Sequence, residues 1–291
     1  MAPLDDRIVT LPDGRSVAVA TYGDRTGRPV IFCHGAPVSR IGNDALDEPA
    51  RVRNVRVLCL DRPGIGRTDP GAMTTVADVV ADVGAVADLL GLGRFEVIGY
   101  SCGGPYALAC AARLGDRVTA VATMAGAGPL DRPGARDGLS KSDLRLLDLS
   151  TRRPRAAAAL LRVQALAARR APGLAVKALA GELGPADGEA LRDGLGALTM
   201  RSFVEALRQG PAGAVDEYLR WGARPWGFDF SAVQVPVHVF QGEADRMVPI
   251  HHAQDLVART PHAALHLLPG EGHISIQRRA GDILDALPAA A

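Results

Sequence analysis

Short, continuous apolar runs, separated by polar turns and by segments with helical spacing, dominate the first half of the chain. Four of these runs are Pro29–Cys33, Val55–Leu60, Phe95–Ile98 and Val118–Met124. Continuous runs, unlike alternating ones, are typical of strands buried on both faces of a parallel sheet. The pattern therefore predicts an α/β fold built on a mostly parallel sheet.

Two elements outside these runs carry clear local signals. Arg7–Leu11 and Ser16–Ala20 flank a Pro-Asp-Gly turn and predict a β-hairpin. From Thr75 to Leu90, apolar residues recur every three or four positions, which predicts a helix with Asp78 and Asp82 on its solvent side. Thr75, followed three residues later by Asp78, resembles a capping box at the start of that helix.

The alternation of strands and helices stops after Met124. From Ala125 to about Asp229 the chain is rich in Ala, Leu and Arg and shows no convincing strand. Breaks near Pro154, Pro172, Gly184 and Gly210 divide this segment into several predicted helices. Six arginines between positions 152 and 170 surround an Ala/Leu run. We interpret that run as an amphipathic helix with a solvated basic face, and not as a membrane-surface helix, because its apolar face is mostly alanine.

Strands and helices alternate again towards the end of the chain. The predicted elements are Pro236–Phe240, a helix over His251–Arg259, Ala264–Leu268 and a helix over Ile274–Leu287. We therefore expect a core domain of residues 1–127 and 230–291, with helices on both faces of its sheet. Residues 128–229 are expected to form a helical cap inserted after the sixth strand.

The most informative stretch for chemistry is Gly99-Tyr100-Ser101-Cys102-Gly103. It follows one apolar run and precedes a helix-forming segment, so G-x-S-x-G lies at a strand-to-helix turn. Such a turn is sharp and strained, and it needs small residues two positions before and after the serine. It exposes a serine hydroxyl at the start of a helix, where a developing anion is favoured. Ser101 is therefore the predicted nucleophile, with a bystander serine in a glycine-rich turn as the alternative.

A serine nucleophile needs a base, and the base needs an acid to orient it. Asp245 follows the strand Pro236–Phe240, and His273 follows the last predicted strand; both lie at the sheet edge that carries Ser101. The order Ser, Asp, His is the one expected for an α/β-hydrolase. Asp131 is the alternative acid, and Glu243 is expected to point elsewhere. Three other histidines are weaker candidates for the base: His34 is expected to support its loop, and His251 and His252 are expected to face solvent.

The chain resembles the α/β-hydrolase fold superfamily, and in particular its cap-bearing serine hydrolases, such as esterases and proline-iminopeptidase-like members. Five motifs in the expected order carry this resemblance: His34–Pro37, Asp61–Gly66, Gly99–Gly103, Gly242–Asp245 and Gly272-His273. The resemblance covers nearly the whole chain. It implies a fold in which the cap covers the site and selects the substrate.

An oxyanion hole needs two backbone N–H groups. Cys102, directly after the nucleophile, is expected to supply one, and the resemblance places the other on Ala36, since Pro37 has no N–H. A thiol nucleophile at Cys102 is disfavoured because its side chain should point away from that of Ser101. The residues expected to line the substrate site are Gly35, Tyr100, Met124, Met247 and Val248.

Composition narrows the range of partners. The 291 residues carry a formal net charge of +1 and only 4% aromatic residues, which argues against a nucleic-acid partner. The four cysteines form no C-x-x-C pair and are expected to be free thiols in a cytoplasmic protein. The first residues show no signal-peptide pattern, and no run of about 18 apolar residues predicts a membrane span. The expected ligand is a small-molecule substrate, with no metal or organic cofactor; a homodimer stays open.

The sequence thus predicts a serine hydrolase that cleaves a small carboxylic ester, lactone or thioester through an acyl-enzyme. A proline-iminopeptidase-like aminopeptidase and a carbon–carbon bond hydrolase are alternatives within enzymes. An aminopeptidase needs carboxylates in the cap that bind the substrate ammonium. Glu205, Asp216 and Glu217 are possible ligands for it, whereas Glu182, Asp187, Glu189 and Asp193 are expected in a solvated turn near Gly184-Pro185. A ligand-binding receptor or pseudoenzyme on the same fold is the alternative from another class. A haloalkane dehalogenase or epoxide hydrolase is disfavoured, since the resemblance there requires aspartate in place of Ser101.

Overall fold

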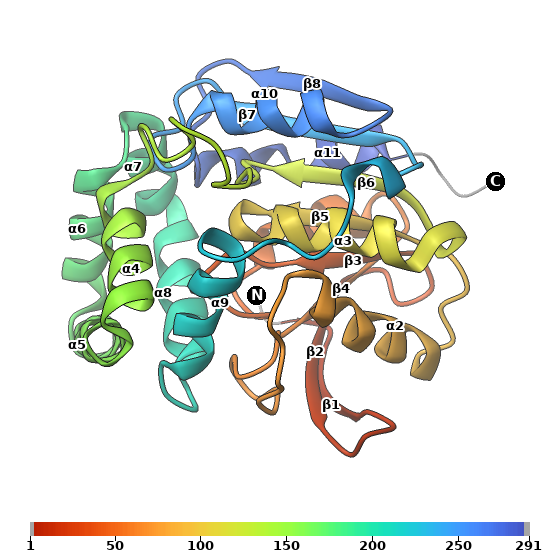
Figure 1. The fold of residues 1–291 in the computed structure, drawn as a ribbon, viewed down its shortest axis with the longest axis horizontal. Coiled ribbons are helices and arrows are strands. Elements are labelled where there is room, and N and C mark those ends of the chain that lie inside the picture. The colour runs from red at the N-terminus through yellow and green to blue at the C-terminus, as the bar shows by residue number, and fades with distance from the viewer. Residues whose placement is uncertain (1–2, 288–291) are drawn as a thin grey trace.

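A central sheet of eight strands organises residues 3–287, the part of the chain that the computed structural model describes (Figure 1). The strands follow the order β1-β2-β4-β3-β5-β6-β7-β8 across the sheet. Their bounds are β1 Asp5–Thr10, β2 Ser16–Gly23, β3 Arg28–Cys33, β4 Val55–Leu60, β5 Phe95–Tyr100, β6 Val118–Met124, β7 Val237–Gly242 and β8 Ala263–Leu268. Residues 1–2 and 288–291 lie outside the described residues. Both segments were predicted to belong to the core domain, and the N-terminal one was predicted not to start a signal peptide.

The predicted hairpin and the predicted parallel sheet are both confirmed. Strands β1 and β2 pair antiparallel, and β2 also pairs antiparallel with β4. All the remaining neighbours, from β4 through β3 to β8, pair in parallel. The carboxyl ends of β3, β5, β6, β7 and β8 therefore meet at one edge of the sheet, where ligands bind in open α/β folds.

Helices cover both faces of this sheet and close two hydrophobic clusters. On one face lie α2 (Val80–Leu89), α3 (Gly104–Leu114) and α10 (Ile250–Arg259). On the other lie α1 (Asp47–Arg51) and α11 (Ala280–Ala286). Burial on both faces explains why the sequences of the central strands are continuous apolar runs.

Six α-helices occupy the chain between β6 and β7, and none of the described residues there forms a strand. They are α4 Lys141–Arg152, α5 Pro154–Arg170, α6 Pro172–Glu182, α7 Pro185–Ala190, α8 Gly196–Ala206 and α9 Ala212–Gly222. Three of these helices begin at a proline, where the missing N–H costs nothing and the fixed φ suits the first turn. The helices gather beyond the end towards which the β6 arrow points, on the left in Figure 1.

The helix predicted over Thr75–Leu90 is present, with a first turn of 3₁₀ type before α2. The capping box is formed: the Asp78 carboxylate accepts from the N–H of Thr75, and the Thr75 hydroxyl accepts from the N–H of Asp78. The expectation that Asp82 faces solvent is wrong. Its side chain is buried and paired with Arg15 of the N-terminal hairpin at 2.5 Å, a partner 67 residues away.

No helix among residues 3–287 has both the length and the apolar character that crossing a membrane requires.

Candidate active site

Ser101 lies on a strained turn between β5 and α3. Its φ is +54°, in the left-handed region that residues other than glycine rarely adopt. A Cβ on Gly103 would lie 2.0 Å from the carbonyl oxygen of Cys33, and one on Gly99 would lie 2.5 Å from the carbonyl oxygen of Gly103. Glycine at both positions therefore lets the helix start directly against the neighbouring strand, and the turn presents Ser101 at the sheet edge.

Two hydrogen bonds link Ser101, His273 and Asp245. The Ser101 hydroxyl lies 3.0 Å from Nε2 of His273, and Nδ1 of His273 lies 2.9 Å from Oδ2 of Asp245. With Nδ1 protonated and donating to the carboxylate, Nε2 is free to accept the serine proton. The imidazole is almost fully buried, so bulk water does not compete for these contacts.

The electrostatic surroundings of His273 favour the imidazolium. Burial acts to lower the pKa of His273, but the charge and hydrogen bond of Asp245 act in the opposite direction, and the net pKa lies above its usual value. The charges of Asp187 and Asp143 contribute in the same sense. A proton on this imidazole is thus stabilised by the surrounding carboxylates.

Asp245, and not Asp131, is the carboxylate in contact with the histidine. Its Oδ1 accepts from the backbone N–H groups of Met247 and Val248 at 2.8 and 2.9 Å, which fixes the carboxylate in place. Asp131 is exposed, forms a two-pronged ion pair with Arg259, and borders a separate surface hollow.

The loop after β3 runs beside Ser101. A Cβ on Gly35 would lie 3.2 Å from the Cβ of Ser101, so the bare backbone of this loop borders Ser101. Arg62 donates to the carbonyl oxygens of His34 and Gly35 at 2.7 and 2.8 Å. The peptide between Gly35 and Ala36 is trans, so its N–H points away from the carbonyl that Arg62 holds. Nδ1 of His34 lies 2.7 Å from the same Gly35 oxygen, so Arg62 and His34 together set the direction of the Ala36 N–H.

Two other candidate residues, His34 and Cys102, have surroundings that oppose proton transfer. Burial, followed by the charge of Arg62, holds the pKa of His34 well below its usual range, so this imidazole is neutral. Burial also raises the pKa of the Cys102 thiol far above its usual value, which disfavours a thiolate.

The expectation for His252 is wrong. His252 is buried and accepts from the N–H of Gly128 at 3.0 Å, because helix α10 turns this side chain towards the loop after β6 and not towards solvent.

The residues expected to line the substrate site divide into two groups. Gly35 borders Ser101, and Met247 and Val248 support Asp245 through their backbone N–H groups. Tyr100 and Met124 are instead packed in the hydrophobic cluster on the α1/α11 face of the sheet. The Tyr100 hydroxyl donates to the carbonyl of His273 at 3.1 Å. Side chains alternate between the faces of a strand, and the face could not be assigned from continuous apolar runs.

Sequence reasoning misplaced one buried carboxylate of the helical insertion, Asp187, and did not predict the ion-pair partner of another, Glu217. Asp187, expected in a solvated turn near Gly184, is fully buried and accepts from the N–H of His273. Glu217 is fully buried and pairs with Arg62. Neither residue has a local sequence signal, since each partner lies at least 86 residues away.

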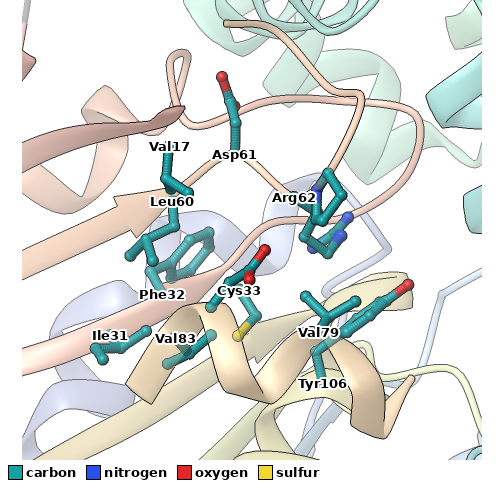
Figure 2. A pocket seen from close by; sticks show the side chains of 12 residues that line it. Val17, Ile31, Phe32, Cys33, Leu60, Asp61, Arg62, Val79, Val83 and Tyr106 are labelled. Carbon is teal, nitrogen blue, oxygen red and sulfur yellow. The ribbon is translucent and has the colours of Figure 1, made fainter. Parts of the chain in front are cut away.

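A small cavity lies beneath Arg62, between β3, the end of β4 and α2 (Figure 2). Its volume of about 20 Å³ suffices for roughly one water molecule. Arg62 lies 4.5 Å from the ring centre of Tyr106; both line the cavity and lie on the right in Figure 2. Ser101, His273 and Asp245 are not among its lining residues, so it lies apart from the candidate catalytic residues. No group of three or more His, Cys, Asp or Glu side chains within residues 3–287 is arranged to hold a metal ion.

Comparison with known proteins places this architecture in a family. The family model of the alpha/beta hydrolase fold matches residues 28–277, and the chain belongs to that family. A proline iminopeptidase from Xylella fastidiosa is 32% identical over 114 residues, which cover 38% of this chain and 36% of that protein. The chain thus spans about a third of the length of the curated relatives it matches.

Solved structures extend the likeness to the whole fold. A bromoperoxidase from Bacillus anthracis has a TM-score of 0.74 at 16% identity, covering 97% of this chain and 98% of that one. A thermophilic esterase from Thermogutta terrifontis has a TM-score of 0.69 at 21% identity, covering 97% and 96%. At such identities the likeness concerns the fold alone.

Proposed function

We propose that the protein is a serine hydrolase that cleaves a small carboxylic ester through an acyl-enzyme. The observation that carries this proposal is the continuous chain of hydrogen bonds from Ser101 through His273 to Asp245, at 3.0 and 2.9 Å. Each member comes from a different strand end at one edge of the sheet, and the order along the chain is that of α/β-hydrolases.

In the proposed reaction, His273 removes the proton of Ser101 while the serine oxygen attacks the substrate carbonyl. Asp245 keeps Nδ1 protonated and stabilises the imidazolium. The imidazolium then donates its proton to the leaving alcohol, which leaves an acyl group on Ser101. A water molecule, deprotonated by the same histidine, releases the acid in the second half of the reaction.

The negative charge that forms on the carbonyl oxygen needs two fixed donors. We assign these to the N–H groups of Cys102 and Ala36. The contacts of Arg62 with the carbonyls of His34 and Gly35 support this assignment, because they fix the orientation of the peptide that carries the Ala36 N–H.

We further propose that residues 128–229 act as one cap over a core of residues 1–127 and 230–291. Buried ion pairs join the two parts: Arg62 with Glu217, and Arg40 with Glu205 at 3.0 Å. Such pairs are costly to separate, because each leaves an uncompensated charge. We therefore expect the cap to select the substrate without leaving the core.

A second function, cleavage of an N-terminal aminoacyl amide, is favoured by two observations. One is the local likeness to proline iminopeptidases. The other is Glu217 Oε2, a buried carboxylate oxygen without a hydrogen-bond partner among the described residues, whose charge acts on the thiol of Cys102. An aminopeptidase must bind the ammonium group of its substrate, and a buried carboxylate can compensate the desolvated positive charge.

Most cap carboxylates, however, are already engaged. Asp143 accepts from the Tyr218 hydroxyl at 2.7 Å, Asp187 accepts three backbone N–H groups, and Glu205 pairs with Arg40. An ester needs no ammonium site, and its alcohol leaves with less help from the general acid. We therefore rank ester hydrolysis first.

The test combines labelling with a comparison of substrates. A fluorophosphonate probe should label the wild type and should not label Ser101→Ala; covalent labelling of the alanine variant would contradict the nucleophile. kcat/KM should be higher for a short-chain p-nitrophenyl ester than for prolyl naphthylamide. A value for the amide at or above that for the ester, lost in Glu217→Gln, would establish the aminopeptidase instead.

A further inference from the structure

The carboxylate of Asp187, from helix α7, lies against the loop that carries His273. Its Oδ2 accepts from the N–H of His273 at 2.9 Å, and its Oδ1 accepts from the N–H groups of Ile274 and Ser275 at 2.8 and 2.9 Å. The side chain has no measurable exposure to solvent. One carboxylate from the helical insertion therefore satisfies three successive backbone donors at the predicted base.

These three donors are paired with the Asp187 carboxylate and not with the side chains of the loop itself. The hydroxyl of Ser275 pairs with a different donor, the N–H of Gly272, at 2.7 Å. Buried N–H groups are costly to leave unpaired, and hydrogen bonds to a charged acceptor are about twice as strong as neutral ones. The conformation of residues 272–275 thus depends on Asp187.

The loop is also shaped to admit this side chain. A Cβ built on Gly272 would lie 2.4 Å from Oδ1 of Asp187, and its three nearest neighbours all belong to that carboxyl group. Glycine at position 272 is therefore explained by the approach of Asp187, because its φ lies outside the left-handed region.

The charge of Asp187 also acts on the imidazole. The acidic groups that face His273 are Asp245 from the loop after β7, Asp187 from α7 and Asp143 from α4, and all three favour the imidazolium. Loss of the charge at Asp187 would lower the pKa of His273.

We propose that Asp187 is a positioning residue of the cap that holds the backbone of His273 in register with Ser101. For its effect on rate, this inference rests on the proposed function. The cap would then contribute to catalysis directly, because a displacement of α7 would release the backbone of His273 from its position beside Ser101.

The first test is Asp187→Asn in the full chain. The amide can keep only part of the contact, because its NH₂ group would face a backbone donor. We expect the rate of fluorophosphonate labelling and kcat for an ester to fall about 10²-fold, with KM nearly unchanged, as for a misplacement of about 1 Å. The acid limb of the pH–rate profile should move to lower pH, because the base loses a nearby negative charge.

The matched control is Glu189→Gln, which removes a carboxylate from the same helix. Glu189 is exposed and lies 3.7 Å from Arg278, so its loss should change the rate by less than about twofold. If Glu189→Gln loses as much activity as Asp187→Asn, the loss comes from general disruption of α7, and the proposal is overturned.

The second test reaches the same contact from the loop and does not depend on whether Asp187→Asn folds. Gly272→Ala should lower the rate about as much as Asp187→Asn, because its methyl group displaces the carboxylate. In an Asp187→Ser background, which leaves room for that methyl group, Gly272→Ala should cost nothing further. Losses that add fully in the double variant would contradict a shared mechanism.

An NMR titration of the His273 imidazole separates this inference from the proposed function. Should the wild type fail to react with the phosphonate, the proposed function falls, while a lowered His273 pKa in Asp187→Asn still supports the positioning role. Should the wild type react and the variant match it in both rate and His273 pKa, the positioning role is refuted and the hydrolase stands.

Discussion

The substitution Arg62→Met tests two expected contributions of this side chain, one to stability and one to catalysis. The guanidinium is buried and makes three kinds of contact: an ion pair with Glu217, hydrogen bonds to two loop carbonyls, and a cation–π contact with Tyr106. Methionine has a similar length and suits an apolar site, so the change removes the charge and the donors with little loss of volume.

The structure sets the expected size of each effect. Glu217 is 1% exposed, and removing one partner of such a buried pair typically costs about 3–5 kcal/mol of stability. Released from Arg62, the Gly35 carbonyl keeps only its 2.7 Å contact with Nδ1 of His34, so the Ala36 N–H is held less firmly. Loss of one oxyanion donor typically lowers kcat about 10²–10³-fold. KM should change little, because that donor acts on charge that develops only in the transition state.

The double variant Arg62→Met/Glu217→Leu distinguishes these effects. Replacing both charges by apolar side chains is often neutral for stability, so the free energy of unfolding should recover towards the wild-type value. The rate should not recover, since the His34 carbonyl still lacks its donor and the Gly35 carbonyl keeps only its contact with Nδ1 of His34. Urea unfolding and ester kinetics on the same samples measure both quantities. Recovery of kcat together with stability would refute the assignment of Arg62 to the oxyanion loop.

Two further predictions concern the acid and a buried histidine. Asp245→Asn should lower kcat about 10⁴-fold, because asparagine favours the wrong tautomer of His273, whereas Asp131→Asn should leave the rate of ester hydrolysis nearly unchanged; the reverse result would move the acid to Asp131. Burial, followed by the charge of His251, lowers the pKa of His252 to about 4, against about 6.5 in an unfolded chain. Between these values the unfolded state binds the extra proton, so the free energy of unfolding should fall by about 3 kcal/mol as pH drops from 6.5 to 4. His252→Gln should flatten this dependence in urea titrations, and an unchanged pH slope would show that another group is responsible.

Much of the fold follows from signals that are local in the chain. The continuous apolar runs correctly predicted strands buried on both faces, and the prolines at 154, 172 and 185 marked the starts of helices. The G-x-S-x-G turn was predictable because its strain is resolved within five residues, by glycines where a Cβ would strike the backbone. The three candidate catalytic residues could be selected because parallel strands bring their carboxyl ends to one edge.

Tertiary structure decided the contacts between distant parts of the chain. The sequence marked Asp187 as a member of a solvated turn and Asp82 as an exposed residue, yet both are buried against partners more than 60 residues away. It also suggested that Met124 would border the substrate, whereas the face of the strand places it in the core. A sequence does not show whether a carboxylate contacts water, an arginine or three backbone N–H donors. Only the packing of the helical insertion on the sheet selects among these environments, because the partner that compensates a buried charge is supplied by another element.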